Sequence, residues 1–523
     1  MTAAAATADS IPAQSSPLPP LRGFNLALLT LGLSLGTFIE VLDVTVANVA
    51  VPTIAGSLGV SNSQGTWVIS SYSVAGAIVV PLTGWMARRV GEVRLFLWSV
   101  LLFTLASMLC GLAPSFQALV ALRIIQGLVS GPMMSLSQTI LVRSFPPDKR
   151  NMALALWAMT LVIAPIMGPV VGGWIIDTWS WPWIFYINLP VGLFSYASCA
   201  VLLRGRDTAT DKPPVDVVGI ILIVFGVGAL QMMLDLGRDR AWFESSFIVT
   251  LAVIAFVCIG FLLIWELTEK HPAIDLTLLR ERTFASCVGV ASLGMMVFSA
   301  VAVIFPLWLQ TMMGYSAEQA GLATAPVGLT TLLVSVLIAR SMSKFDLRLL
   351  SSFGFCVFAG VLFWNSHFTL DMSFGQVIMP RFVQGIGVAC FFIPLTTATL
   401  SRVPEHQLAM ASSLSNFLRN LSAALGTAIS VTLWDNRATW HHAVLGESLN
   451  HASLATQQYL DRLHAAGVPH GRDYAILNQL LNQQGYMIAT NEVFYACGGL
   501  CLVLAALIWL AKPRTGMTAS LGH

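Results

Sequence analysis

Long, uninterrupted apolar runs recur along almost the whole of this 523-residue sequence. A helical run of about 20 apolar residues, rising 1.5 Å per residue, spans the roughly 30 Å hydrocarbon core of a bilayer. Backbone in hydrocarbon must satisfy its own hydrogen bonds, so each run is a helix or a barrel strand. The runs are too long and too continuous for barrel strands, which are shorter and alternate. We therefore predict an all-α, polytopic membrane protein.

We count fourteen such runs. They cover approximately residues 24–50, 63–86, 93–113, 116–142, 150–176, 183–203, 215–235, 246–267, 284–310, 316–340, 348–366, 373–400, 405–433 and 492–511. Hydrophobic residues make up 56% of the chain and charged residues only 10%, whereas soluble domains carry about 25% charged residues. This composition excludes a soluble enzyme, a disordered chain and a nucleic-acid-binding protein with a basic face.

The basic residues predict the orientation. With the N-terminus in the cytoplasm, most of the 27 Lys and Arg fall in inside loops, as the positive-inside rule requires. Both termini are then cytoplasmic, with tails at 1–23 and 512–523. The first tail is rich in Ala, Ser and Pro and has no basic segment before its apolar residues, so we interpret it as flexible rather than as a cleavable signal.

A short motif occurs twice. Span four contains Arg123-Ile-Ile-Gln126-Gly127, and span twelve contains Arg381-Phe-Val-Gln384-Gly385. Both arginines lie about eight residues, or ~12 Å, into a helix that enters from outside. Such a repeat indicates two related six-helix halves, as in many transporters.

The repeat sets the predicted domain boundaries. The N-terminal six-helix bundle would cover 24–204 and the C-terminal bundle 284–511. The spans at 215–267 are then two inserted helices. The second bundle includes an outside segment, 434–491, the only large polar stretch.

Two acids lie well inside a predicted span. Glu40 and Asp43 are three residues apart, so they share one helix face, and acids in hydrocarbon are functional candidates by default. Asp43 lies at nearly the depth of Arg123, so an ion pair is geometrically possible. The pair is either a permanent structural contact or a titratable carboxylate that exchanges a proton for substrate. Glu40 either lines a cavity for a cationic substrate or is a secondary acid or solvated rim residue.

Other polar groups within spans are candidates for a cavity. Arg419 lies mid-span without an obvious acidic partner, so it has either a cavity or coupling role or a structural role bonded to carbonyls, polar groups or water. Arg381 and Gln126 of the repeated motif are further candidates to line the cavity or contact substrate. Span five combines two prolines with closely spaced glycines, which indicates either a tight helix crossing or a bend that closes a leak; the residues are Pro165, Gly168, Pro169, Gly172 and Gly173.

The polar segment 434–491 holds five of the nine histidines, and its apolar spacing predicts one or two short amphipathic helices. It is a solvated cap, a docking site for a partner outside, or a metal site, although no ligand geometry is evident. The eight cysteines all lie in apolar stretches without metal-type spacing. We therefore expect no metal, disulfide or cofactor. The segment's histidines are His441, His442, His451, His464 and His470.

Several motifs together resemble the major facilitator superfamily, specifically its fourteen-helix drug:proton antiporters and the EmrB-type inner-membrane subunit of tripartite multidrug exporters. The resemblance covers about 24–511. It rests on Leu42-Asp43-Val-Thr-Val-Ala-Asn-Val-Ala-Val-Pro52, Gly84-Trp-Met-Ala-Arg88-Arg89-Val-Gly91, Arg123…Gly127, Gly168-Pro169-x-x-Gly172-Gly173, Trp183-Ile-Phe-Tyr-Ile-Asn-Leu-Pro190 and Ala389-Cys-Phe-Phe-Ile-Pro-Leu395.

This resemblance implies two bundles around a central cavity that opens alternately to each side. Asp43 would be the acid that couples protons to drug, with Arg123 as its partner. The loop after span two would form a cytoplasmic gate, through Gly84, Arg88, Arg89, Gly91 and Arg94. Membrane lipid, hydrophobic small molecules and protons would be the ligands, and a periplasmic adaptor protein and an outer-membrane channel the partners. The protein would lie in the bacterial inner membrane.

Two positions depart from the group's pattern: Arg88 stands where the superfamily loop usually has Asp, and Pro182 where the group often has Arg. The leading functional hypothesis is proton-driven export of amphiphilic drugs. The alternative within transport is a proton-coupled transporter of one physiological solute, such as a fatty acid or siderophore. A membrane scaffold or enzyme is a further class, but no nucleophile–base set, metal cluster or phosphate-binding loop supports an enzyme.

Overall fold

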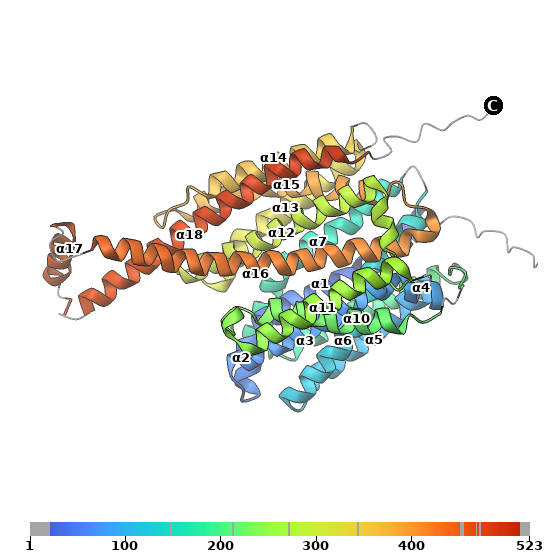
Figure 1. Ribbon diagram of the computed structural model, residues 1–523, viewed down its shortest axis with the longest axis horizontal. Coiled ribbons are helices and arrows are strands. Elements are labelled where there is room, and N and C mark those ends of the chain that lie inside the picture. The colour runs from blue at the N-terminus through green and yellow to red at the C-terminus, as the bar shows by residue number, and fades with distance from the viewer. Residues whose placement is uncertain are drawn as a thin grey trace, which may run out of the picture.

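The computed structural model describes residues 21–146, 149–211, 214–269, 272–342, 345–449, 454–466, 468–469 and 472–512, and every regular element among them is helical (Figure 1). The longer helices of the first part are α1 (Gly23–Ser57), α3 (Trp67–Val79), α4 (Thr83–Val90), α5 (Glu92–Gly111), α6 (Phe116–Ser144), α7 (Arg150–Thr178), α9 (Asn188–Leu202), α10 (Val217–Leu236) and α11 (Ser246–Thr268). Those of the second part are α12 (Arg282–Thr311), α13 (Ala317–Ser341), α14 (Leu347–Asn365), α15 (Phe374–Leu400), α16 (Leu408–Ser448), α17 (Leu454–Ala465) and α18 (Arg472–Leu507). Short helices α2 (Asn62–Gly65) and α8 (Trp183–Tyr186) connect them.

The number of spans is close to the prediction but does not reproduce it. Twelve helices in the described ranges are long and apolar enough to cross a membrane. Helix α7 makes a thirteenth when its two parts, which are bent by 42° between Pro165 and Met167, count as one. The predicted span at 405–433 corresponds to α16, which is continuous but does not pass this test of length and apolarity. Its buried polar residues, Asn416 and Arg419 among them, lower its apolarity.

The helices of each half of the chain pack mainly against one another. In the first half α1 packs on α7 and α9, and α6 on α3 and α5; in the second half α12 packs on α16, and α15 on α13 and α14. Helices α10 and α11 form a pair that lies against α3. The two halves meet where α7 packs on α13 and α6 on α16 (Figure 1). The predicted boundaries at 24–204, 215–267 and 284–511 stay predictions.

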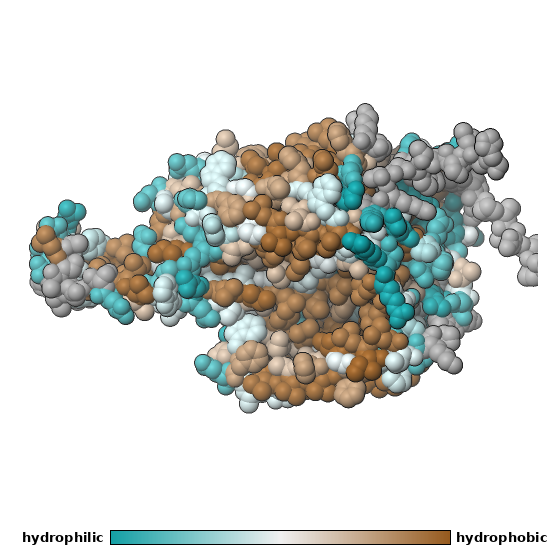
Figure 2. Space-filling view, turned by 45° about the horizontal axis from the view of Figure 1, so that its top comes forward, coloured by the Kyte–Doolittle hydropathy of each residue, from teal (hydrophilic) through white to brown (hydrophobic). Residues whose placement is uncertain are grey.

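The surface has the distribution expected of a membrane protein. On the face shown in Figure 2, hydrophobic residues form a broad band across the middle of the molecule, and hydrophilic residues gather toward its two ends. Only 17% of the most apolar 18-residue stretch of α11 is buried, and Phe256 on that helix is 82% exposed. Soluble proteins rarely expose so large an apolar surface, so this band faces lipid.

The two ends of the molecule differ. Helix α4 and the C-terminal end of α18 lie at one end, which we call the terminal end; α2 and α17 lie at the other, which we call the hairpin end (Figure 1). At the hairpin end, the segment 434–491 contains one short helix, α17, as the sequence predicts, but it is not mainly a loop. Helices α16 and α18 instead continue through most of it, and α17 caps them.

Contacts between α16 and α18 explain why these helices continue. The ring centre of Trp434 lies 4.6 Å from that of Tyr486, with the two planes tilted by 59°, and the Trp434 indole N–H donates to Thr490 (2.8 Å). Arg437 forms an ion pair with Glu492 (2.6 Å). Two of the five histidines in this segment, His451 and His470, lie outside the described residues.

Candidate functional site

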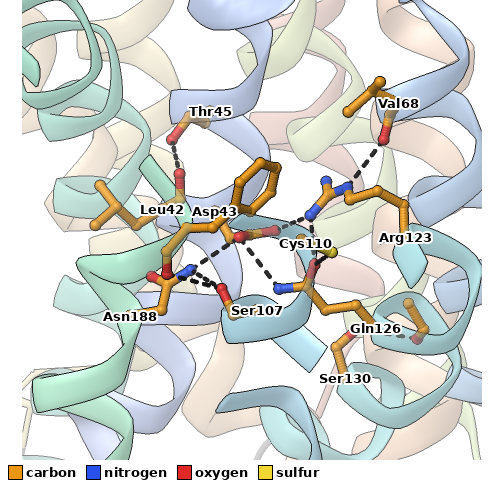
Figure 3. A network of polar contacts seen from close by, with 12 residues as sticks. Leu42, Asp43, Thr45, Val68, Ser107, Cys110, Arg123, Gln126, Ser130 and Asn188 are labelled. Atoms are coloured by element: carbon orange, nitrogen blue, oxygen red, sulfur yellow. Dashed lines mark hydrogen bonds and ion pairs between the residues drawn. The ribbon is translucent and has the colours of Figure 1, made fainter. Parts of the chain in front are cut away.

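A buried ion pair joins α1 and α6 (Figure 3). Asp43 is 3% exposed and Arg123 is fully buried. Arg123 Nη1 donates to Asp43 Oδ2, and the other carboxylate oxygen, Oδ1, accepts from Asn188 Nδ2 (2.9 Å) and Gln126 Nε2 (3.3 Å). Helices α1, α6 and α9 therefore supply one network around a single carboxylate.

Other groups also hold the Arg123 guanidinium, whose Nη2 alone has no hydrogen-bond partner among the described residues. Its Nε donates to the Val68 carbonyl (2.9 Å) and its Nη1 to Gln126 Oε1 (2.8 Å). Its central carbon lies 4.2 Å from the centre of the Tyr72 ring and 5.6 Å from that of Phe185, within reach of cation–π attraction. The planar group is thus fixed in one orientation. Gln126, a sequence candidate for the cavity, is instead fully buried in this network.

Asn188 and Ser107 are members of the network that sequence reasoning did not assign. Asn188 Nδ2 also donates to Ser107 Oγ (3.0 Å), and that hydroxyl donates to the Phe185 carbonyl (2.9 Å). Asn188 lies inside the quoted Trp183–Pro190 run. A buried asparagine within an apolar run needs a hydrogen-bond partner. This requirement is the feature of the sequence that could have identified Asn188 as a site residue.

Glu40 lies one turn before Asp43 and remains apart from this network. It is half-buried, and its Oε2 has no hydrogen-bond partner within the described part of the chain. The preceding turn is linked to α7 by a chain of hydrogen bonds. Thr37 Oγ1 lies 2.6 Å from Ser137 Oγ, which accepts from Trp157 Nε1 (3.0 Å).

The glycines of α7 allow a close crossing with α1 directly after Asp43. A side chain at Gly168 would overlap Thr45, and one at Gly172 would press on Val46, whereas Gly173 faces open space. Pro165 and Pro169 lie in the bent part of the same helix. The crossing fixes the position of α1 relative to α7, which in turn packs on α13 of the second half.

The second copy of the repeated motif has no acidic partner within the part of the chain that the structure describes. Arg381 is 2% exposed, and its Nη1 donates to Gln384 Oε1 (2.5 Å). Its guanidinium carbon lies 3.6 Å from the ring centre of Phe305 in α12. The first helix of each half thus provides the neighbour of the motif arginine, Asp43 in one half and an aromatic ring in the other.

The predicted gate loop joins α4 and α5 at the terminal end. Gly84 lies against Met410 at the start of α16, so a side chain there would collide with the second half. Gly91 has φ +102°, which only glycine adopts readily, and it faces the carboxylate of Asp207. Arg94, which is 72% exposed, pairs with that carboxylate at 3.3 Å.

Arg88 has an acidic partner despite its departure from the family pattern. Its Nη2 donates to Asp211 Oδ2 (2.5 Å), and the Asp211 amide donates to the Arg88 carbonyl (3.2 Å). Asp211 belongs to the connection between α9 and α10. The same connection accepts two further bonds from the start of α5, with Thr208 Oγ1 binding the Glu92 amide (3.1 Å) and Asp207 Oδ1 the Val93 amide (3.0 Å). Arg89 lies 5.7 Å from the Trp85 ring.

A polar pocket of about 610 Å³ opens beside this loop between the two halves. Two cations of the first half line it and bind one acidic residue of the second half. Arg150 pairs with the Glu405 carboxylate (2.6 Å), and Arg143 donates to the Glu405 carbonyl (2.5 Å). Ser413 Oγ adds a bond to the Val80 carbonyl (2.6 Å). These contacts join the two halves at the terminal end.

Two membrane-spanning halves that meet at one end, with a buried ion pair between two helices of the first half, are typical of a membrane transporter. The family comparison agrees: residues 33–427 match the model of the Major Facilitator Superfamily. The chain belongs to this superfamily and is a membrane transporter rather than an enzyme.

Relatives align along almost the whole chain. The fatty acid resistance protein FarB of Neisseria gonorrhoeae is 48% identical over 495 residues, 95% of this chain and 98% of that protein. The multidrug export protein EmrB of Escherichia coli (strain K12) is 47% identical over 498 residues, 95% of this chain and 97% of that protein. The solved proton:xylose symporter XylE shares the fold, with a TM-score of 0.60 at 14% identity over 93% of this chain and 95% of that one.

Proposed function

We propose that this chain is a proton-driven antiporter that exports amphiphilic drugs across the bacterial inner membrane. The observation that carries the proposal is the Asp43 carboxylate, which is 3% exposed inside a membrane span and is bound by three donors from two other helices. An ionisable group at such a depth is costly and is typical of a proton pathway. The identity of 47% to a multidrug export protein supports the drug as cargo.

Protonation of Asp43 is the coupling step. The neutral acid no longer balances the charge of Arg123, so the ion pair that joins α1 to α6 weakens. Helix α1 crosses α7 in the next turn, at Thr45 and Val46, and α7 packs on α13. A change at Asp43 is thereby carried to the contact between the halves, where rigid-body rocking alternates access.

The terminal end is the cytoplasmic side in this proposal. Its closure by Arg143, Arg150 and Glu405 then corresponds to a state closed toward the cytoplasm. The hairpin end lies in the periplasm. There, the α16–α18 hairpin extends beyond the apolar band (Figure 2) and would dock a periplasmic adaptor, which connects to an outer-membrane channel.

The test is drug uptake into everted membrane vesicles whose lumen is acidified. The wild type accumulates drug, and Asp43→Asn should abolish accumulation at an unchanged protein level. Asp235→Asn is the matched control, since Asp235 is an acid at the end of another span, α10, where it accepts a bond from Gln231 (2.9 Å). Normal uptake by Asp43→Asn would remove the coupling role of Asp43.

A second candidate is proton-coupled transport of one physiological solute. The 48% identity to a fatty acid resistance protein favours a fatty acid as that solute. A panel of cationic, neutral and acidic amphiphiles in the same vesicles separates the two candidates. Transport of several unrelated compounds supports drug export, and transport of fatty acids alone supports the second candidate.

A further inference from the structure

Arg419 lies in α16 where the two halves of the molecule meet. One turn earlier, Asn416 Nδ2 donates to Ser135 Oγ of α6 (3.2 Å). The guanidinium carbon of Arg419 lies 5.8 Å from the ring centre of Trp157 in α7 and 4.7 Å from that of Phe392 in α15. One aromatic ring from each half therefore flanks the cation.

This cation has no counter-ion among the described residues. Arg419 is 3% exposed, and its Nε has no hydrogen-bond partner. Its Nη1 makes a long contact to Asn416 Oδ1 (3.4 Å). A guanidinium stays protonated in proteins, and a buried charge without a partner is strongly unfavourable. The surroundings of Arg419 therefore favour binding of an anion.

The other unpaired ionisable groups differ from Arg419 in ways that matter. Glu40 can become neutral by taking up a proton, so it does not require a counter-ion. Arg381 is also without an acid, but both its ring neighbour and its hydrogen-bond partner belong to the second half. Arg419 alone among these three combines a permanent charge with neighbours from both halves.

Along α16, the residues that follow Arg419 toward the hairpin end are more exposed than those that precede it. Residues 411–416 of α16 are all buried, whereas Asn420 is exposed and Ser422 is half-buried. Gly426 packs on Met296 of α12, which runs in the same direction. Ser292 on that helix, whose hydroxyl has no partner, therefore lies within about one turn of the level of Arg419.

We propose that Arg419 binds the carboxylate of an anionic amphiphile, whose adjoining apolar chain contacts Trp157 and Phe392. A carboxylate accepts two parallel hydrogen bonds from a guanidinium, and the two aromatic rings beside Arg419 offer apolar contacts to the adjoining chain. The inference rests on the proposed function, because it names an acidic class of cargo for the same transporter.

The experiment measures binding without a proton gradient. Wild type, Arg419→Gln and Arg419→Lys are placed in phosphatidylcholine nanodiscs, and equilibrium binding of decanoate and of uncharged decanol is measured at about pH 8, where the acid is ionised. We expect Arg419→Gln to weaken decanoate binding by about tenfold or more and to change decanol binding less than twofold. Arg419→Lys should retain part of the affinity.

Arg437→Gln is the matched control, because it removes a cation from the same helix but outside this site. Unfolding temperatures of all variants establish that each is folded. Unchanged decanoate binding in folded Arg419→Gln, or an equal loss of decanol binding, would overturn the inference. Displacement of decanoate by phosphatidylglycerol in the disc would also overturn it, because that result assigns the site to a lipid headgroup. Arg419-dependent binding by a protein that moves no protons would instead overturn the proposed function alone.

Discussion

Gly168 of α7 lies directly against Thr45 of α1, two residues after the buried carboxylate of Asp43. This contact leaves no room for a side chain, so we expect α1, which carries the acid, and α7, which touches the second half, to move as one unit. We expect Gly168→Val to separate them, at a cost of about 1–3 kcal/mol in stability, and to impair transport. Gly173→Val, in the same helix but facing open space, is the control. Equal transport by both variants would mean that the crossing is not required.

Lysine should not replace Arg123. The guanidinium donates from Nε to the Val68 carbonyl and from Nη1 to Asp43 and Gln126, and an ammonium group cannot reproduce this planar set. Arg123→Lys should therefore lose most proton-coupled transport in the vesicle assay, nearly as much as Arg123→Ala. Full activity of the lysine variant would show that charge alone suffices.

The Arg88–Asp211 pair should help to close the terminal end. Both side chains are partly exposed, 38% and 56%, so the pair contributes only about 0–1 kcal/mol. We expect Asp211→Arg to shift the population toward a terminal end that is open, as measured by spin-label distances across the two halves. The double exchange Arg88→Asp with Asp211→Arg should restore the wild-type distances. If the double variant stays as open as the single one, the pair is not part of the gate.

The hairpin should serve partners rather than transport itself. Replacing α17 (Leu454–Ala465) with a Gly-Ser linker of equal length removes the cap and leaves the Arg437–Glu492 pair in place. We expect transport in proteoliposomes to stay within about twofold of wild type, while drug resistance in cells is lost. Loss in both assays would instead assign the cap to the transport cycle.

The sequence was sufficient to predict the fold because hydrocarbon imposes a simple rule of length and apolarity. It also indicated that Asp43 and Arg123 lie at one depth, because helical rise converts residue number into distance. It did not indicate Asn188 or Tyr72, because their contacts depend on how separate helices rotate about their axes. The continuation of α16 past residue 433 was missed because pairing of Trp434 with Tyr486 and Thr490 stabilises helix where the sequence turns polar.

The acidic partner of Arg88 was also missed because it comes from a distant part of the chain. A family pattern predicts an acid within the loop itself, but Asp211 comes from a connection more than 100 residues further along the chain. A contact between residues so far apart leaves no local signal in one sequence. The predicted and observed numbers of spans differ for a related reason. The buried polar residues of α16 make this packed helix less apolar than the helices that face lipid.

Proton movement coupled to cargo release tests the central claim most directly. Purified protein is reconstituted into proteoliposomes that hold substrate and a pH-sensitive dye, and these are diluted into substrate-free buffer at equal pH. For the wild type, outward movement of substrate should acidify the lumen as protons enter in exchange, and Asp43→Asn should leave the lumen pH unchanged. Substrate release without acidification by the wild type, or equal acidification by Asp43→Asn, would contradict the account.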